Sequence, residues 1–156
     1  MLKVGDRAPE LALADQHGNT LKLTTYKGRK VFVYFYPKAD TPGCTLQSCL
    51  LRDLVSAGQV GDTAIIGISP DPSPRQQKFD AKYALGFPLL ADTEHVVAEG
   101  YGVWKEKTLY GRKYMGIERS AFLINEKGRI SHVWYKISPK DTPGSLLAAL
   151  GDGGPS

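Results

Sequence analysis

Two cysteines stand five residues apart, and the residues before the first of them suit the start of a helix. Cys44 and Cys49 are the two cysteines of the 156-residue chain. Thr41 is a candidate N-cap, and Pro42 suits the first helical position, where its missing N–H costs no hydrogen bond. Gly43 lets the backbone come close to a neighbouring group. Cys44 would then lie in the first turn, near unpaired N–H groups and the positive end of the helix dipole, a position that favours the nucleophilic thiolate.

The flanking segments predict a strand, a short loop and a helix. Residues 31–36 are β-branched and aromatic, as expected of a buried strand. Residues 43–57 predict an amphipathic helix that ends at Gly58. The leucines that define its predicted apolar face are Leu46, Leu50 and Leu54. Ligand sites in α/β sheets lie beyond the carboxyl ends of strands, which is where Cys44 would sit. The alternative is a structural turn with an inert cysteine.

The rest of the chain alternates strands with helices. Further strands are predicted at 11–13, 20–23, 63–69, 88–91, 120–124 and 130–135, and further helices at 73–83, 93–101 and 141–150. This order predicts an α/β fold with an N-terminal β-hairpin, parallel strand pairs, a late antiparallel hairpin, and helices on both faces of a mixed sheet. We expect one domain over residues 1–150 and a disordered tail over 151–156.

Composition and charge narrow the function classes. No apolar run reaches the ~18 residues of a membrane span, and the N-terminus has no signal-peptide pattern. We therefore expect a cytoplasmic protein without a membrane partner, in which two cysteines are catalytic or redox-active rather than a permanent disulfide. The net charge of +4 is scattered along the chain, which argues against nucleic-acid binding. His17, His95 and His132 share no ligand spacing, so we expect no metal, and nothing calls for a cofactor.

The stretch from Tyr36 to Thr45 closely resembles the active-site motif of peroxiredoxins, because it contains a Pro-x-x-x-Thr-x-x-Cys core. Other features resemble the bacterioferritin-comigratory, or peroxiredoxin Q, branch of that family. They are Cys49, the pair Arg52-Asp53, and the runs 101–104 and 119–124. The resemblance extends over about residues 4–150. One departure is Gln47, where members often carry Glu; we expect this position to affect partner contacts or helix stability without touching the core motif.

The resemblance implies a thioredoxin-like fold and thiol-dependent reduction of hydrogen peroxide and organic hydroperoxides. It implies that Cys44 is the peroxidatic cysteine, which becomes a sulfenic acid, and that Cys49 is the resolving cysteine, which forms a disulfide with it. The resemblance also implies that Pro37, Thr41 and Arg119 support the reaction. An outside dithiol protein must reduce the disulfide, and thioredoxin is the partner that the resemblance implies. Members of this branch are often monomeric.

Simple energetics explain why such a site needs a cation. Lowering a thiol pKa from ~8.5 to about 6 takes ~3.4 kcal/mol, whereas a helix N-terminus supplies roughly 0.3–1 and at most ~2 kcal/mol. Arg119 keeps its proton and begins a predicted strand, so it is the candidate to supply the rest of the stabilisation that the thiolate needs. Charge on the departing oxygen also needs donors. The candidates are the Thr41 hydroxyl, the Gly43 and Cys44 N–H groups and Arg119. Pro37 would shield the sulfur from water.

The spacing of the two cysteines constrains the second step. On an ideal helix, Cα atoms five residues apart are about 8.6 Å from each other, whereas a disulfide needs less than about 7 Å. We therefore hypothesise that the first turns of this helix unwind between oxidation of Cys44 and formation of the disulfide. We also expect Cys49 to be buried on the apolar face of the helix.

Two other functions remain open. A general thiol-disulfide oxidoreductase on the same fold would reduce insulin without peroxide, although the absence of a Cys-x-x-Cys pair weakens this interpretation. A redox-sensing protein would pass oxidation to a partner and consume peroxide slowly. Three acidic residues near the motifs are expected to be solvated or paired: Asp40, Asp53 and Glu118.

Overall fold

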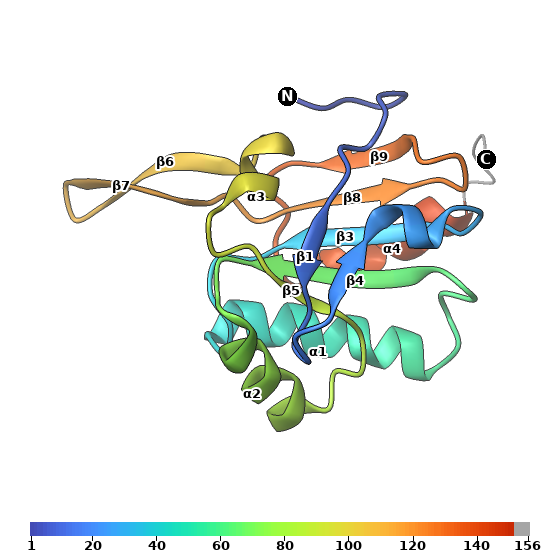
Figure 1. The fold of residues 1–156 in the computed structure, drawn as a ribbon, viewed down its shortest axis with the longest axis horizontal. Helices are drawn as coiled ribbons and strands as arrows, with labels where there is room; N and C mark the ends of the chain where they lie inside the picture. Colours follow the sequence, from blue (N-terminus) through green and yellow to red (C-terminus); the bar gives the residue numbers. More distant parts are fainter. Residues whose placement is uncertain (152–156) are drawn as a thin grey trace.

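The computed structural model describes residues 1–151, and its centre is a five-stranded sheet in the order β5-β4-β3-β8-β9 (Figure 1). These strands are β3 (Val31–Phe35), β4 (Ala64–Ser69), β5 (Leu89–Ala91), β8 (Ser120–Ile124) and β9 (Ile130–Trp134). β5, β4 and β3 are parallel, β8 is antiparallel to β3, and β9 is antiparallel to β8. The predicted mixed sheet with a late antiparallel hairpin is therefore confirmed.

Helices flank this sheet unequally. They are α1 (Pro42–Ser56), α2 (Ser73–Tyr83), α3 (Val96–Gly100) and α4 (Thr142–Gly151). Phe32 and Tyr34 of β3 belong to an apolar cluster with residues of α1, α2 and α4. Val33 and Phe35 belong to a second cluster, with residues of α3 and of the N-terminal segment. Successive side chains of a strand point to opposite faces, so the three longer helices cover one face and α3 lies on the other.

The N-terminal hairpin is present as predicted, and the end of the chain differs slightly from the prediction. β1 (Ala12–Ala14) pairs with β2 (Thr20–Lys22), and a 3-10 helix, η1 (Leu23–Tyr26), follows. Gly151 belongs to α4 rather than to the predicted tail. The remainder of that predicted tail, 152–156, lies outside the described residues.

A second hairpin, absent from the sequence-based prediction, extends away from the body of the molecule (Figure 1). β6 (Trp104–Leu109) pairs with β7 (Arg112–Ile117) in antiparallel register. Tyr110 and Gly111 form the two-residue turn, both with positive φ, as a type I′ hairpin turn requires. Most side chains of these strands are exposed on both faces. No alternation of buried and exposed residues therefore marks the two strands in the sequence.

The face of α1 that packs on the sheet differs from the predicted leucine face. Its buried residues are Cys44, Gln47, Ser48, Leu51 and Leu54, whereas Leu46 is 46% exposed. The polar members are buried because they have partners: the Ser48 hydroxyl is 2.7 Å from the hydroxyl of Tyr34. A hydrogen-bonded polar group can occupy a core position. The helix is thus rotated so that Cys44 faces the sheet and Cys49 is half-buried.

Candidate active site

Cys44 occupies the first turn of α1, just beyond the carboxyl end of β3. Thr41 is at the N-cap position with extended backbone (φ −97°, ψ 156°), and Pro42 begins the helix. The Thr45 N–H donates to the Thr41 carbonyl at 2.8 Å, which closes that turn. Cys44 is buried and is a free thiol. The predicted strand, loop and helix are therefore confirmed, and the sulfur lies near the positive end of the helix dipole.

Arg119 brings a positive charge to this sulfur from the residue before β8. Its Nη2 donates to Cys44 Sγ at 3.3 Å. The guanidinium passes over Gly43, where an added Cβ would come within 3.2 Å of Nη2. A glycine is therefore what allows the close approach of the cation to the helix start. Arg119 therefore places a guanidinium, which keeps its charge at any physiological pH, directly against the buried sulfur.

Gln47 holds Arg119 from the other side. Arg119 Nη1 donates to Gln47 Oε1 at 2.7 Å, and Gln47 Nε2 donates to Thr142 Oγ1 at 2.9 Å. Thr142 in turn donates to the Ser138 carbonyl at 2.8 Å. The Gln47 side chain therefore makes its hydrogen bonds to Arg119 and Thr142 and none to residues 37–44, and its link to Arg119 is a contact that the sequence analysis did not predict. Its position three residues after Cys44, on the same helix face, is the sequence signal for this contact.

The Thr41 hydroxyl is used differently from the expectation. It donates to the Lys38 carbonyl at 2.7 Å and makes no capping bond to the helix. Its proton is thus committed within the loop, and the oxygen offers lone pairs rather than a donor. Thr41 can therefore accept a hydrogen bond from a hydroperoxide, whereas donation to the departing oxygen would need the hydroxyl to turn.

Pro37 and Cys49 flank Cys44 in the chain, and neither makes a hydrogen bond to the Arg119 guanidinium, whose bonds go to Gln47 and Cys44. Pro37 follows the last residue of the buried run and is half-buried; its shielding of the sulfur stays a prediction. Cys49 is half-buried rather than buried as expected, and it packs beside the apolar cluster that contains Cys44. Both thiols are free and belong to one uninterrupted helix. The spacing argument for unwinding therefore applies to this helix without modification.

The loop before Cys44 is attached to α2 and to the segment before it. The Ala39 N–H donates to Asp71 Oδ2 at 2.7 Å. Asp40 pairs with Lys82 Nζ at 3.0 Å and accepts a hydrogen bond from the Tyr83 hydroxyl at 2.8 Å. These two hydrogen bonds, with Lys82 first, lower the pKa of the Asp40 carboxyl from its usual value. The expectation that Asp40 is paired is thus confirmed.

The other two acidic residues lie in different surroundings. Asp53 pairs with Arg52, at 2.9 Å between Oδ1 and Nη2, as expected for a paired surface carboxylate. Glu118 is half-buried next to Arg119 in the chain, at the base of the β6–β7 hairpin, where its N–H donates to the Val103 carbonyl at 2.8 Å.

An open hollow of about 460 Å³ leads from solvent to Arg119. It lies between the β6–β7 hairpin and the segment after β9, and its lining includes Lys107, Tyr114, Glu118, Lys136 and Ile137. Burial and the nearby Arg119 guanidinium lower the pKa of Lys107. Sequence reasoning missed Lys107 because it missed the hairpin that carries it. The hollow offers a small substrate a route to the guanidinium.

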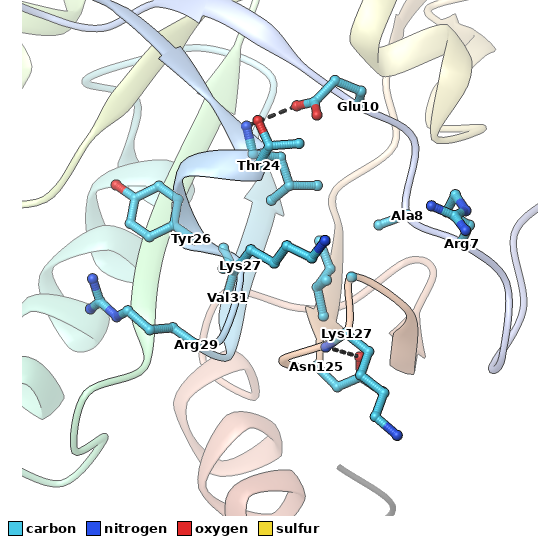
Figure 2. A pocket seen from close by; sticks show the side chains of 13 residues that line it. Arg7, Ala8, Glu10, Thr24, Tyr26, Lys27, Arg29, Val31, Asn125 and Lys127 are labelled. Atoms are coloured by element: carbon cyan, nitrogen blue, oxygen red, sulfur yellow. Dashed lines mark hydrogen bonds between the residues drawn. The ribbon is translucent and has the colours of Figure 1, made fainter.

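A second cavity, of about 220 Å³, lies at the opposite end of β3 (Figure 2). Its floor is apolar, and its rim carries Arg7, Lys27, Arg29 and Lys127. Its lining contains no cysteine, so it is separate from the site around Cys44. Within residues 1–151, no His, Cys, Asp and Glu side chains gather in threes to form a metal site, and no helix has the length and hydropathy to cross a membrane.

Comparison with known proteins covers nearly the whole chain. The AhpC/TSA family model matches residues 4–133. This chain belongs to the AhpC/TSA family. It is 46% identical to peroxiredoxin Bcp of Bacillus subtilis over 151 residues, which are 97% of this chain and 96% of the relative. It is 47% identical to peroxiredoxin Bcp of Escherichia coli K12 over 133 residues, 85% of each chain.

Solved structures share the fold of this AhpC/TSA protein. Peroxiredoxin Q of Xylella fastidiosa superposes with a TM-score of 0.89 at 28% identity, over 97% of this chain and 96% of the other. The bacterioferritin comigratory protein of Xanthomonas campestris superposes with a TM-score of 0.84 at 33% identity, over 90% of each chain. The resemblance to the peroxiredoxin Q branch and the predicted thioredoxin-like fold are both confirmed.

Proposed function

We propose that this AhpC/TSA protein reduces hydrogen peroxide and organic hydroperoxides to water and alcohols, with Cys44 as the peroxidatic residue. The contact that carries the proposal is the 3.3 Å hydrogen bond from Arg119 to the Cys44 sulfur in the first turn of α1. The relative from Xanthomonas campestris is described for its alkyl peroxide reduction activity, which supports the same reaction class here.

In the first step the Cys44 thiolate attacks one peroxide oxygen and the O–O bond breaks. Sulfur loses two electrons and becomes a sulfenic acid, while the departing oxygen takes the electron pair and a proton and leaves as water or an alcohol. Arg119 would stabilise the negative charge that moves from sulfur to oxygen. Gln47 would keep the guanidinium in place, and Thr41 would orient the hydroperoxide by accepting its hydrogen bond.

In the second step the Cys49 thiol attacks the sulfenic acid, a disulfide forms and water leaves. Because both cysteines lie on one helix, we propose that the first turns of α1 unwind before this step. Circular dichroism and amide exchange of the oxidised protein should show lost helix. Unchanged helix together with a proven disulfide between Cys44 and Cys49 would refute the unwinding.

In the third step an outside dithiol reduces the disulfide back to two thiols and becomes oxidised itself. We propose thioredoxin as this reductant, with the protein acting as a monomer in the cytoplasm. The half-burial of Cys49 supports this order of events. Unwinding would expose the disulfide to a protein partner only after oxidation.

Peroxide consumption with a thioredoxin system tests the proposal on the wild type, Cys44→Ser and Cys49→Ser. Cys44→Ser should be inactive, whereas Cys49→Ser should complete one turnover and then require small thiols. Equal activity of Cys44→Ser and wild type would refute the proposal. Insulin reduction without peroxide consumption would favour the general oxidoreductase. Slow consumption with a stable mixed disulfide would favour the redox sensor.

A further inference from the structure

Tyr83, the last residue of α2, contacts the chain on both sides of the two cysteines. Its hydroxyl donates to Asp40 Oδ1 at 2.8 Å, and its backbone carbonyl accepts a hydrogen bond from Arg52 Nη1 at 2.6 Å. Asp40 precedes the first turn of α1, and Arg52 lies on α1 beyond Cys49. One residue outside the helix therefore holds both ends of the segment 41–51. We call Tyr83, Asp40 and Arg52 the Tyr83 clamp.

Neighbouring contacts strengthen the clamp at each end. Lys82 pairs with the second carboxylate oxygen of Asp40 at 3.0 Å, and Asp53 accepts from the Arg52 guanidinium at 2.9 Å. Asp40 has a φ of 60°, in the left-handed region that aspartate adopts more readily than most residues other than glycine. The Tyr83 ring packs edge-on against buried Phe79, with 5.7 Å between centroids. The clamp is thus anchored to the core.

We propose that Tyr83 is a positioning residue that keeps segment 41–51 helical while Cys44 reacts with peroxide and limits how fast the segment opens for Cys49. The proposal rests on the proposed function, because it concerns the step that forms the disulfide. Tyr83 makes no hydrogen bond to Cys44, Cys49 or Arg119 in the described residues, so we infer that its hydroxyl acts through its hold on the helix.

The physical argument concerns the cost of opening. Unwinding the first turns of α1 moves the chain between two points that the clamp holds fixed. Either the Asp40 contact breaks, or the opened segment gains less conformational freedom than free ends would allow. Both effects raise the free energy of the open state. Because Asp40 and Lys82 are partly exposed, their contacts are modest in strength, so loss of the hydroxyl should speed opening about two- to fivefold.

Faster opening has a chemical consequence. A sulfenic acid on Cys44 either condenses with Cys49 or meets a second peroxide, which oxidises it to a sulfinic acid. Two outcomes therefore compete for the same intermediate. A variant that opens faster should form more disulfide and less sulfinic acid at a given excess of peroxide.

Tyr83→Phe tests the proposal, because it removes the hydroxyl and keeps the ring against Phe79. Tyr110→Phe is the matched control, since Tyr110 is 95% exposed at the tip of the β6–β7 hairpin. Rapid-quench mass spectrometry separates sulfenic acid formation from disulfide formation. In Tyr83→Phe the first rate should stay within twofold of wild type, the second should rise about two- to fivefold, and the sulfinic acid yield should fall. The control should match wild type in all three.

A second measurement does not depend on peroxide chemistry. Amide exchange of segment 41–51 in reduced Cys49→Ser should be about two- to fivefold faster when Tyr83→Phe is added. Lys82→Gln should change exchange in the same direction. An unchanged rate of disulfide formation together with unchanged exchange in Tyr83→Phe would overturn the proposal. A fall in the rate of sulfenic acid formation as large as any change in the rate of disulfide formation would also overturn it. If the wild type consumed no peroxide, the proposed function would fail, and the exchange experiment would still decide on the clamp.

Discussion

Arg119 and Cys44 are 75 positions apart in the sequence, yet Nη2 of one donates to Sγ of the other at 3.3 Å. The antiparallel pairing of β8 with β3 makes this possible. Phe35 at the end of β3 pairs with Ser120 at the start of β8, so the residue before β8 meets the loop after β3. The sheet register thus places a permanent cation beside a thiol at the start of a helix.

Replacement of Arg119 should slow the first step strongly. Arg119→Gln removes the charge and the donor to sulfur, and loss of one such donor costs about 10²- to 10³-fold in rate. Arg119→Lys should fall between this variant and wild type, because one ammonium cannot contact both Cys44 and Gln47 as the fork does. Stopped-flow measurement of sulfenic acid formation checks both, with Arg112→Gln on exposed β7 as the control. A rate within threefold of wild type for Arg119→Gln would remove Arg119 from the mechanism.

Gly43→Ala should lower the rate of attack on peroxide without lowering the stability of the fold. The added methyl group would lie 3.2 Å from Arg119 Nη2, so the guanidinium must shift by a few tenths of an ångström. Alanine is also the better helix former, by up to about 1 kcal/mol. We expect unfolding at an unchanged or higher denaturant concentration, together with an attack rate lower by about three- to tenfold, since small misplacements of catalytic groups are costly. A variant that loses stability and keeps its rate would contradict this reasoning.

Thr142 should affect both stability and the attack rate, because its hydroxyl accepts the hydrogen bond of Gln47. Thr142→Val leaves Gln47 Nε2 without its buried acceptor and removes the donor to Ser138. An unsatisfied buried group costs about 1–3 kcal/mol, so stability should fall by that order, and the attack rate should fall because Arg119 loses its support. Thr142→Ser keeps the hydroxyl and should restore both. Failure of Thr142→Ser to restore the rate would show that packing, rather than the hydrogen bond, is what counts.

The Asp40 contacts predict a dependence of stability on pH. Hydrogen bonds from Lys82 and Tyr83 lower the pKa of Asp40 in the folded state. A carboxyl whose pKa is lowered on folding contributes stability above its unfolded pKa of ~3.9, and this contribution is lost as pH falls through the folded value. The free-energy difference between wild type and Asp40→Asn should therefore be constant between about pH 5 and 8 and shrink below about pH 4. Denaturant unfolding at several pH values measures this free-energy difference. A difference that persists in acid would show that the ionised Asp40 carboxylate is not its source.

Sequence reasoning succeeded where the signals were local. The strand at 31–35 and the helix start at Thr41, Pro42 and Cys44 follow from neighbouring residues, and the structure has them in place. The role expected of Arg119 came from family resemblance, and the structure brings its guanidinium to the sulfur. Nothing local in the sequence around residue 119 indicates that contact, because it depends on strand register.

Sequence reasoning failed where a distant partner decides the outcome. Gln47 is buried because Thr142, 95 positions away, accepts its hydrogen bond, and a polar residue without a known partner is expected at the surface. The same contact helps to rotate α1 and leaves Leu46 exposed. The β6–β7 hairpin was not predicted because its strands lack a buried face. Lys107, which lies on this hairpin, was therefore not recognised as a residue near Arg119. Tyr83 ends a predicted helix, and nothing in the sequence indicates that its hydroxyl reaches Asp40, 43 positions away.

Intact-mass spectrometry after one equivalent of peroxide tests the central claim, that the Cys44 sulfur itself attacks the O–O bond. Reduced Cys49→Ser should gain the mass of one oxygen, located on Cys44 by peptide mapping after trapping of the sulfenic acid. Reduced Cys44→Ser, which keeps Cys49, should gain none on the same timescale. Rapid oxygen transfer to Cys44→Ser, or none to Cys49→Ser, would contradict the account.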